Sequence, residues 1–215
     1  MYNNKLRFFF FLSATLHIIA FVIIFHLYNR TIINEALYEE AKYHIVVGKY
    51  PKIDDNGLLC ETNSIILGNE SNKNKLTVFI TSDCYYCKKF LGNHLDYLYS
   101  NYVSNNKLSI ELNFTGYLKD SRQQELFLFN LFNKSDDIGR LEVINSFLKT
   151  GLEQKTNFDF FERKKQIENN RNIAYDLDIY QFPTFILNER KIIGLLSLKD
   201  FSKLLDVEFA HSKDI

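Results

Sequence analysis

The sequence predicts an α/β domain preceded by an amino-terminal transmembrane helix. Three observations support this interpretation: a long uncharged stretch near the amino terminus, short apolar runs alternating with amphipathic helical runs, and a Cys-x-x-Cys motif between a strand and a helix. The chain has 215 residues, of which 46% are hydrophobic. A chain of this size can bury one good core, so we expect a single folded domain.

Charge and cysteine content exclude two classes of protein. The 26 basic and 26 acidic residues balance to zero, and the chain after Tyr28 carries 24 basic against 26 acidic residues, or −2. This charge differs from the strongly basic footprint of a nucleic-acid-binding protein. The three cysteines are too few for the disulfide framework of a small secreted domain.

The amino-terminal segment has the features of an uncleaved membrane anchor. Residues 1–7 contain Lys5 and Arg7, and residues 8–28 are 21 residues without a charged side chain. A helix of that length spans about 30 Å, the thickness of the hydrocarbon core. Cleavable signal peptides have a shorter apolar region followed by an Ala-x-Ala pattern, which is missing here. The positive residues before the span predict that residues 1–7 are cytoplasmic and that the rest lies outside.

The segment after the span predicts a connector followed by the folded domain. Residues 29–63 begin with a helix-like stretch and then contain Gly48, Pro51 and the turn-forming run 54–57. We interpret residues 29–63 as a stalk and residues 64–210 as the domain.

Within the domain, the hydrophobic period predicts the order of the elements. Strands are expected at 64–67, 76–80, 107–114, 184–187 and 191–195, the last two as a hairpin. Helices are expected at 88–103, throughout a helical insertion at about 117–178, and from near Ser197, where Asp200 completes a capping-box spacing.

Cys84 and Cys87 carry the expected chemistry. A thiol attacks a disulfide as its thiolate, and the free N–H groups and dipole of a helix amino terminus stabilise that anion. Cys84 falls at such a terminus, and Asp83 beside it has the residue type of a helix cap. Cys87 lies one turn further along and can close onto Cys84. We therefore expect attack by Cys84 and resolution by Cys87.

Zinc is the alternative interpretation of these cysteines. Cys60, Cys84, Cys87 and His94 could supply a Cys3His set, although the sequence has no second paired motif. We favour redox chemistry, with no metal. Cys60 is then expected to be a buried free thiol, or else to form a regulatory or intermolecular disulfide.

Pro183 supports the redox interpretation. It stands at the head of a predicted strand, where a trans proline would remove a hydrogen bond from the sheet. A cis bond after Phe182 would explain its placement.

Four segments together resemble the DsbA-like branch of the thioredoxin superfamily: 67–69, 76–80, 84–90 and 182–188. The resemblance covers about residues 64–206. It implies a thioredoxin-like fold, with a central mixed sheet flanked by helices and a helical insertion. It further implies a nucleophilic Cys84, a resolving Cys87, and a cis Pro183 that contacts substrate beside Phe182. The redox-active disulfide Cys84–Cys87 would serve without a further cofactor.

The resemblance also implies a function. We expect a membrane-anchored, extracytoplasmic oxidoreductase that introduces disulfides into exported proteins and is recycled by a membrane redox partner. Its place would be the bacterial inner membrane, with the domain on the periplasmic side. Tyr85 and the bulky Phe182 depart from the family at positions that tune redox poise. A reductase or isomerase kept reduced by a membrane partner, and a non-catalytic binding module, are therefore the alternatives.

Overall fold

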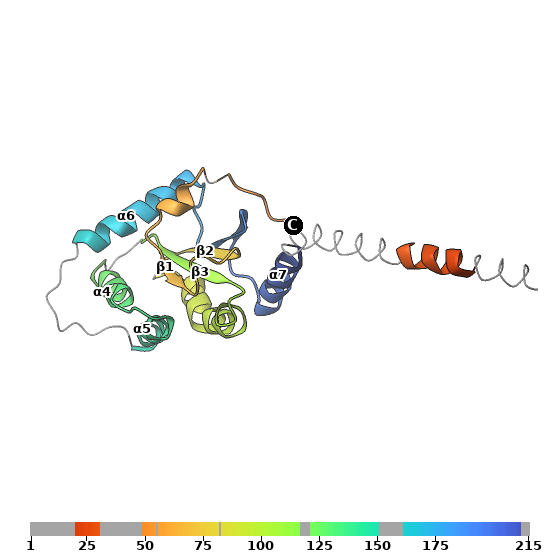
Figure 1. The fold of residues 1–215 in the computed structure, drawn as a ribbon. Helices are drawn as coiled ribbons and strands as arrows, with labels where there is room; N and C mark the ends of the chain where they lie inside the picture. Colours follow the sequence, from red (N-terminus) through yellow and green to blue (C-terminus); the bar gives the residue numbers. More distant parts are fainter. Residues whose placement is uncertain are drawn as a thin grey trace, which may run out of the picture. The chain divides into compact units, whose positions relative to one another are not determined.

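The computed structural model describes residues 20–30, 49–54, 56–81, 83–116, 121–150 and 161–211 (Figure 1). Residues 50–205 form one compact unit, and residues 1–49 and 206–215 are assigned to another. Residues 20–30 are helical. Among the described residues, no helix combines the length and apolarity needed to cross a membrane. The first part of the predicted span, 8–19, and the predicted cytoplasmic residues 1–7 lie outside the described residues.

A five-stranded mixed sheet organises the compact unit. Its strand order is β1-β3-β2-β4-β5, with β2 and β3 parallel and all other neighbours antiparallel. The strands are β1 (Ile65–Leu67), β2 (Lys75–Ile80), β3 (Ser109–Phe114), β4 (Thr184–Leu187) and β5 (Arg190–Ile193). The predicted mixed sheet is therefore confirmed, with strand ends that lie within two residues of the predicted ones.

Helices cover both faces of this sheet. On one face Phe185 of β4 stacks edge-on against Phe90 at 5.0 Å and against Phe201 at 5.1 Å between ring centroids. On the other face Phe79 and Ile186 share a buried cluster with residues of helix α6 (Phe161–Asp176). Figure 1 shows the sheet between α6 and the helix that follows β2.

Double coverage explains why β3 differs from its predicted pattern. Its alternation of apolar and polar residues is typical of a strand with one wet face, yet all six residues are buried. The charged side chain of β3 has its hydrogen bonds inside the protein: the Glu111 carboxylate accepts from Lys75 Nζ at 3.2 Å and from Thr77 Oγ1 at 3.1 Å. A sheet covered on both faces excludes water from polar and apolar positions alike.

The helix after β2 is one continuous run with two π-helical turns. It comprises α2 (Tyr85–Lys89), the π-helix η2 (Phe90–His94), α3 (Leu95–Leu98) and the π-helix η3 (Tyr99–Val103). It begins three residues before the predicted start at 88, because Cys84 is the cap of the first turn. The cysteine pair therefore belongs to the helix itself.

The predicted helical insertion contains three helices. In the part that the structure describes they are α4 (Ser121–Phe132), α5 (Asp137–Thr150) and α6; residues 117–120 before α4 and 151–160 between α5 and α6 are outside it. The start of α5 protects the edge strand β1: the Gly68 N–H donates to Asp137 Oδ2 at 2.8 Å, and Arg140 Nη1 donates to the Ile66 carbonyl. An edge covered in this way cannot pair with another strand.

Residues 50–63, predicted as the end of the connector, belong to the compact unit instead. The Ile53 N–H donates to the Glu189 carbonyl at 2.8 Å, and Lys191 N–H donates to the Pro51 carbonyl at 2.9 Å, so this segment pairs beside β5. The short 3-10 helix η1 (Leu58–Glu61) then packs Leu58 against the α6 side of the core. The sequence of a stretch rich in turn formers does not predict pairing of this kind, because the partner strand is far away in the chain.

The carboxyl-terminal elements follow the predicted chemistry closely. Asn188 and Glu189 have φ values of 46° and 67°, which give the two-residue turn that suits a right-twisted hairpin. Helix α7 (Leu198–His211) begins at the predicted Ser197 cap, with Asp200 hydrogen-bonded to its hydroxyl. The Asp200 N–H donates to Ser197 Oγ at 3.2 Å, and that hydroxyl donates to Asp200 Oδ2 at 2.7 Å.

Candidate redox site

Cys84 caps the helix that carries it. Its backbone is extended (φ −70°, ψ 123°), and its sulfur accepts a hydrogen bond from the Cys87 N–H at 3.2 Å. The Lys88 N–H donates to the Cys84 carbonyl at 3.0 Å and closes the first turn. The cap is therefore the cysteine itself and not Asp83. The Cys87 N–H belongs to the first turn, whose N–H groups have no carbonyl partner within a helix, and it points at the sulfur that would carry negative charge.

Cys87 lies one turn inside and is completely buried. Burial raises the pKa of the Cys87 thiol, and its hydrogen bond with the Cys84 side chain acts in the same direction. A backbone hydrogen bond with Thr81 opposes this increase in the pKa without overcoming it. A buried thiol that holds its proton is a poor attacking group, whereas the sulfur of Cys84 is partly accessible.

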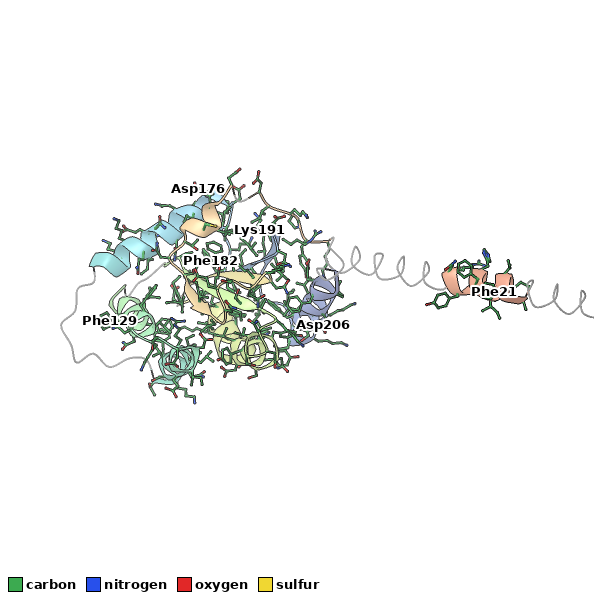
Figure 2. All side chains as sticks on the ribbon, in the orientation of Figure 1. Phe21, Phe129, Asp176, Phe182, Lys191 and Asp206 are labelled. Carbon is green, nitrogen blue, oxygen red and sulfur yellow. The ribbon has the colours of Figure 1, made fainter. Side chains whose placement is uncertain are left out.

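A loop from the far end of the sequence meets the Cys84 sulfur. The Cys84 thiol donates to the carbonyl oxygen of Phe182 at 3.3 Å, across 98 positions of sequence. The peptide bond between Phe182 and Pro183 is cis, as the sequence predicts. Pro183 is buried, and Phe182 is half-buried against the cluster that includes α6 (Figure 2).

Neighbouring hydrogen bonds fix this loop. The Thr184 hydroxyl donates to the Gln181 carbonyl at 2.7 Å, and the Gly194 N–H donates to the Pro183 carbonyl at 2.9 Å. Thr184 also pairs with Phe79 near the end of β2. Because β2 and β4 are antiparallel neighbours, the end of one strand and the start of the other lie at the same edge, which brings the cysteines and the proline together.

The structure does not bring together the four residues of the zinc alternative. No group of three or more His, Cys, Asp or Glu side chains in the described ranges is arranged to hold a metal ion. His94 is buried, and its Nε2 donates to the Leu196 carbonyl at 2.9 Å. Cys60 lies on η1 and lines a pocket of about 580 Å³ together with Lys75 and Thr77, near the start of β2. Cys84 follows the other end of that strand.

Cys60 also corrects a prediction. The sequence indicates a buried free thiol, but Cys60 is exposed. Leu58 and Leu59 of this short helix pack against the core, and the Cys60 side chain that follows them is left in contact with solvent.

Three exposed tyrosines lie near Cys84 and Phe182 along the chain, and only Tyr85 among them was singled out from the sequence. Tyr85 and Tyr86 are 71% and 57% exposed, directly after Cys84. Tyr180 is 66% exposed and lies two residues before Phe182. Its only signal in the sequence is its spacing of three residues before Pro183.

Comparison with known proteins shows the fold. No family model matches the sequence, and no curated protein resembles it closely enough to count as a relative. Among solved structures, a double cysteine-to-alanine variant of α-DsbA1 of Wolbachia pipientis is 18% identical, with a TM-score of 0.56 over 75% of this chain and 98% of that chain. Oxidised BdbD of Bacillus subtilis is 11% identical, with a TM-score of 0.54 over 75% and 97%.

A third structure carries a description of activity. The thiol-disulfide exchange protein α-DsbA2 of Wolbachia pipientis is 15% identical, with a TM-score of 0.52 over 80% of this chain and 97% of that chain. The chain therefore has the thioredoxin-like fold of DsbA proteins, as the resemblance in the sequence implies.

Proposed function

We propose that this chain is a membrane-anchored, extracytoplasmic thiol-disulfide oxidoreductase that introduces disulfides into exported proteins. One observation carries the proposal: a partly accessible Cys84 sulfur caps a helix between the Cys87 N–H and the Phe182 carbonyl. The buried Cys87 lies one turn behind it, within reach for a disulfide. The likeness to a thiol-disulfide exchange protein supports the same chemistry.

The reaction follows from the accessibility of the two sulfurs. In the oxidised pair, a substrate thiolate attacks Cys84 Sγ, the bond to Cys87 breaks, and the Cys87 sulfur leaves with the electron pair and takes up a proton. A second substrate thiolate then attacks its own sulfur in the mixed disulfide and releases Cys84. Two electrons and two protons pass from the substrate to the pair, and the substrate gains a disulfide.

The residues around the sulfur have separate tasks in these steps. The Cys87 N–H stabilises the negative charge on Cys84 as it leaves the mixed disulfide. Burial favours the protonated form of Cys87 after it has been displaced. The loop at Phe182 and Pro183 closes one side of the sulfur and presents backbone groups to an approaching substrate chain.

The direction of transfer is set by the reduction potential. We propose a couple more oxidising than about −200 mV, nearer the roughly −120 mV of DsbA than the roughly −270 mV of thioredoxin. A helix terminus that stabilises the Cys84 thiolate favours the reduced form, and a stabilised reduced form is a stronger oxidant.

The proposed setting is the bacterial inner membrane, with residues 8–28 as a single-pass anchor and the domain on the periplasmic side. A membrane redox partner would reoxidise the pair. The basic residues before the span support this orientation. A reporter enzyme that is active only outside the cytoplasm, fused after Ile215, should be active. Activity of a cytoplasmic reporter alone would contradict the orientation.

Trapping of mixed disulfides tests the chemistry. In Cys87→Ala the Cys84 thiolate can still attack a disulfide of an exported protein, but Cys87 is no longer there to attack the mixed disulfide and displace the partner. Disulfide-linked complexes with exported proteins should therefore accumulate and disappear on addition of a reductant. The matched variant Cys84→Ala should accumulate none. Complexes formed by Cys84→Ala alone would reverse the two assignments, and complexes in neither variant would favour a non-catalytic module.

A further inference from the structure

Two pairs of tyrosines belong to the segments that carry Cys84 and Phe182, whose sulfur and carbonyl oxygen are in contact. Tyr85 and Tyr86 follow Cys84, with ring centroids 5.3 Å apart. On the loop side, Tyr180 contacts Tyr175 near the end of α6, with centroids 5.9 Å apart and planes tilted by 30°. Aromatic side chains left in solvent around a reactive atom offer contact area to whatever approaches it.

The pair on the loop side is close to the reacting sulfur along the chain. Tyr180 is two residues before Phe182, whose carbonyl oxygen lies 3.3 Å from Cys84 Sγ. Tyr175 is 37% exposed, in the last turn of α6. A partner segment whose cysteine reaches Cys84 therefore meets the loop that carries Tyr180.

Carboxylates distinguish this pair from the one after Cys84. Tyr180 Oη donates to Asp178 Oδ1 at 3.2 Å, and the charges of Asp178 and Asp176 act on the same phenol. Figure 2 shows Asp176 at the end of α6, where the negative end of the helix dipole adds to this field. Tyr85 and Tyr86 are followed instead by the exposed Lys88 and Lys89.

Lys191 lies near Asp176 and Asp178, but its ammonium group binds backbone carbonyls. Lys191 Nζ donates to the backbone carbonyls of Leu177 at 3.1 Å and of Asp178 at 3.4 Å. It therefore binds the carbonyl groups that follow α6, and the structure gives it no ion pair with the carboxylate of Asp176 or Asp178. The exposed ring faces and the two carboxylates together suit a positively charged side chain.

We propose that Tyr175, Asp176, Asp178 and Tyr180 form an acidic tyrosine surface that binds an arginine or lysine next to the reacting cysteine of the partner protein. The inference rests on the proposed function and names the substrates that it favours. The guanidinium or ammonium group lies over the ring of Tyr180 and faces the two carboxylates, which holds the partner cysteine beside Cys84. Exposed contacts of this kind predict a rate advantage of about three- to fivefold.

The test uses the oxidised full-length chain in detergent micelles and four short peptides. Each peptide has one cysteine, and they differ only in the adjacent residue: Arg, Gln, Leu or Glu. The measured quantity is the rate of peptide thiol attack on the Cys84–Cys87 disulfide. Each rate is divided by the rate of the same peptide with a small-molecule disulfide, because a neighbouring charge changes the reactivity of the peptide thiol itself.

The Arg peptide should be about three- to fivefold faster than the Gln peptide after this division, and the Glu peptide slower. Asp176→Asn with Asp178→Asn should remove the advantage and leave the Gln rate unchanged. Tyr180→Phe should keep part of it, and Tyr180→Leu less. Tyr97→Leu is the matched control, since Tyr97 is an exposed tyrosine on α3 that contacts Ser202.

Each other outcome has its own meaning. If the Arg, Gln and Glu peptides react at equal rates after normalisation to the small-molecule disulfide, the inference is overturned and the proposed function stands. A Leu peptide as fast as the Arg peptide would show that the tyrosines bind apolar side chains, which also overturns it. If no peptide reacts with the oxidised chain, the proposed function fails, and the inference fails with it.

Discussion

The two ends of β2 each have an accessible cysteine near them, in very different surroundings. Cys84 follows the end of the strand, caps a helix, and has a backbone N–H and a carbonyl against its sulfur. Cys60 lies on a four-residue 3-10 helix and lines a pocket with residues from the start of the strand. Cys60 is the more exposed of the two.

The comparison shows that exposure alone does not make a thiol suited to exchange. Exchange needs a group that stabilises the thiolate and a second thiol within bonding reach. Both are supplied at the Cys84 end by Cys87, through its N–H and its sulfur. The Cys60 end is instead held together by an ion pair between Lys75 and Glu111 at 3.2 Å, which stabilises the sheet.

Removal of each cysteine gives the largest expected difference. Cys84→Ala should abolish oxidation of a dithiol peptide, because the accessible sulfur is lost. Cys60→Ala should change the rate by less than about twofold, since Cys60 plays no part in the exchange steps. Stopped-flow measurement of peptide oxidation by each variant compares them. A large loss of activity in Cys60→Ala would break the distinction between the two ends.

The aromatic packing beneath the Cys84 end gives the next effect. Phe185 is fully buried between Phe90 and Phe201, so Phe185→Ala should lower the free energy of unfolding by about 3 to 5 kcal/mol. Urea unfolding of the reduced protein measures it. Ile193→Ala, at a position 53% exposed on β5, is the control and should cost less than about 0.5 kcal/mol. Similar losses in both variants would contradict the packing described.

The ion pair at the Cys60 end should matter for stability and not for exchange. Glu111→Ala removes the buried partner of Thr77 and Lys75, so the free energy of unfolding should fall by about 1 to 3 kcal/mol. The rate of peptide oxidation should stay within about twofold of the wild type. Lys75→Ala, which removes the 45%-exposed partner, should cost less than about 1 kcal/mol. A loss of peptide oxidation in a folded Glu111→Ala variant would contradict the claim that the Cys60 end of β2 takes no part in exchange.

The smallest predicted effect is a pH dependence that originates on the cysteine helix. Burial lowers the pKa of His94, while the hydrogen bond to the Leu196 carbonyl opposes that shift. The unfolded chain therefore binds the proton at a higher pH than the folded domain, and stability falls as the pH drops below about 6.5. Well above that value the ring is neutral in both states and contributes no pH dependence.

Urea unfolding at about pH 7.5 and about pH 5.5 measures the contribution of His94. The wild type should lose more stability over this interval than His94→Gln, which can still donate to the Leu196 carbonyl. Equal losses in the two proteins would contradict the assignment.

The sequence predicted the elements better than the contacts between them. Short apolar runs and the alternation at 107–114 predicted the strands, and the Ser197 and Asp200 spacing predicted a cap that the structure contains. The burial of Glu111 could not be predicted, because it depends on α6 and η1 covering a face that the local pattern marks as polar. The pairing of Pro51 with Lys191 likewise depends on a strand more than a hundred residues away.

Prediction of the candidate site had the same limit. Cys84, Cys87 and Pro183 can be read from a motif and a proline placed at the head of a strand, and the structure places all three at one edge of the sheet. The hydrogen bond between Cys84 and the Phe182 carbonyl arises only from the antiparallel pairing of β2 with β4. No local pattern encodes it.

The reduction potential of the Cys84–Cys87 couple tests the central claim most directly. The full-length chain in detergent is equilibrated against glutathione mixtures, and unfolding is measured for both redox forms. Our account predicts a potential above about −200 mV, with the reduced form the more stable. A potential below about −230 mV, with the oxidised form the more stable, would contradict it and make this protein a reductase.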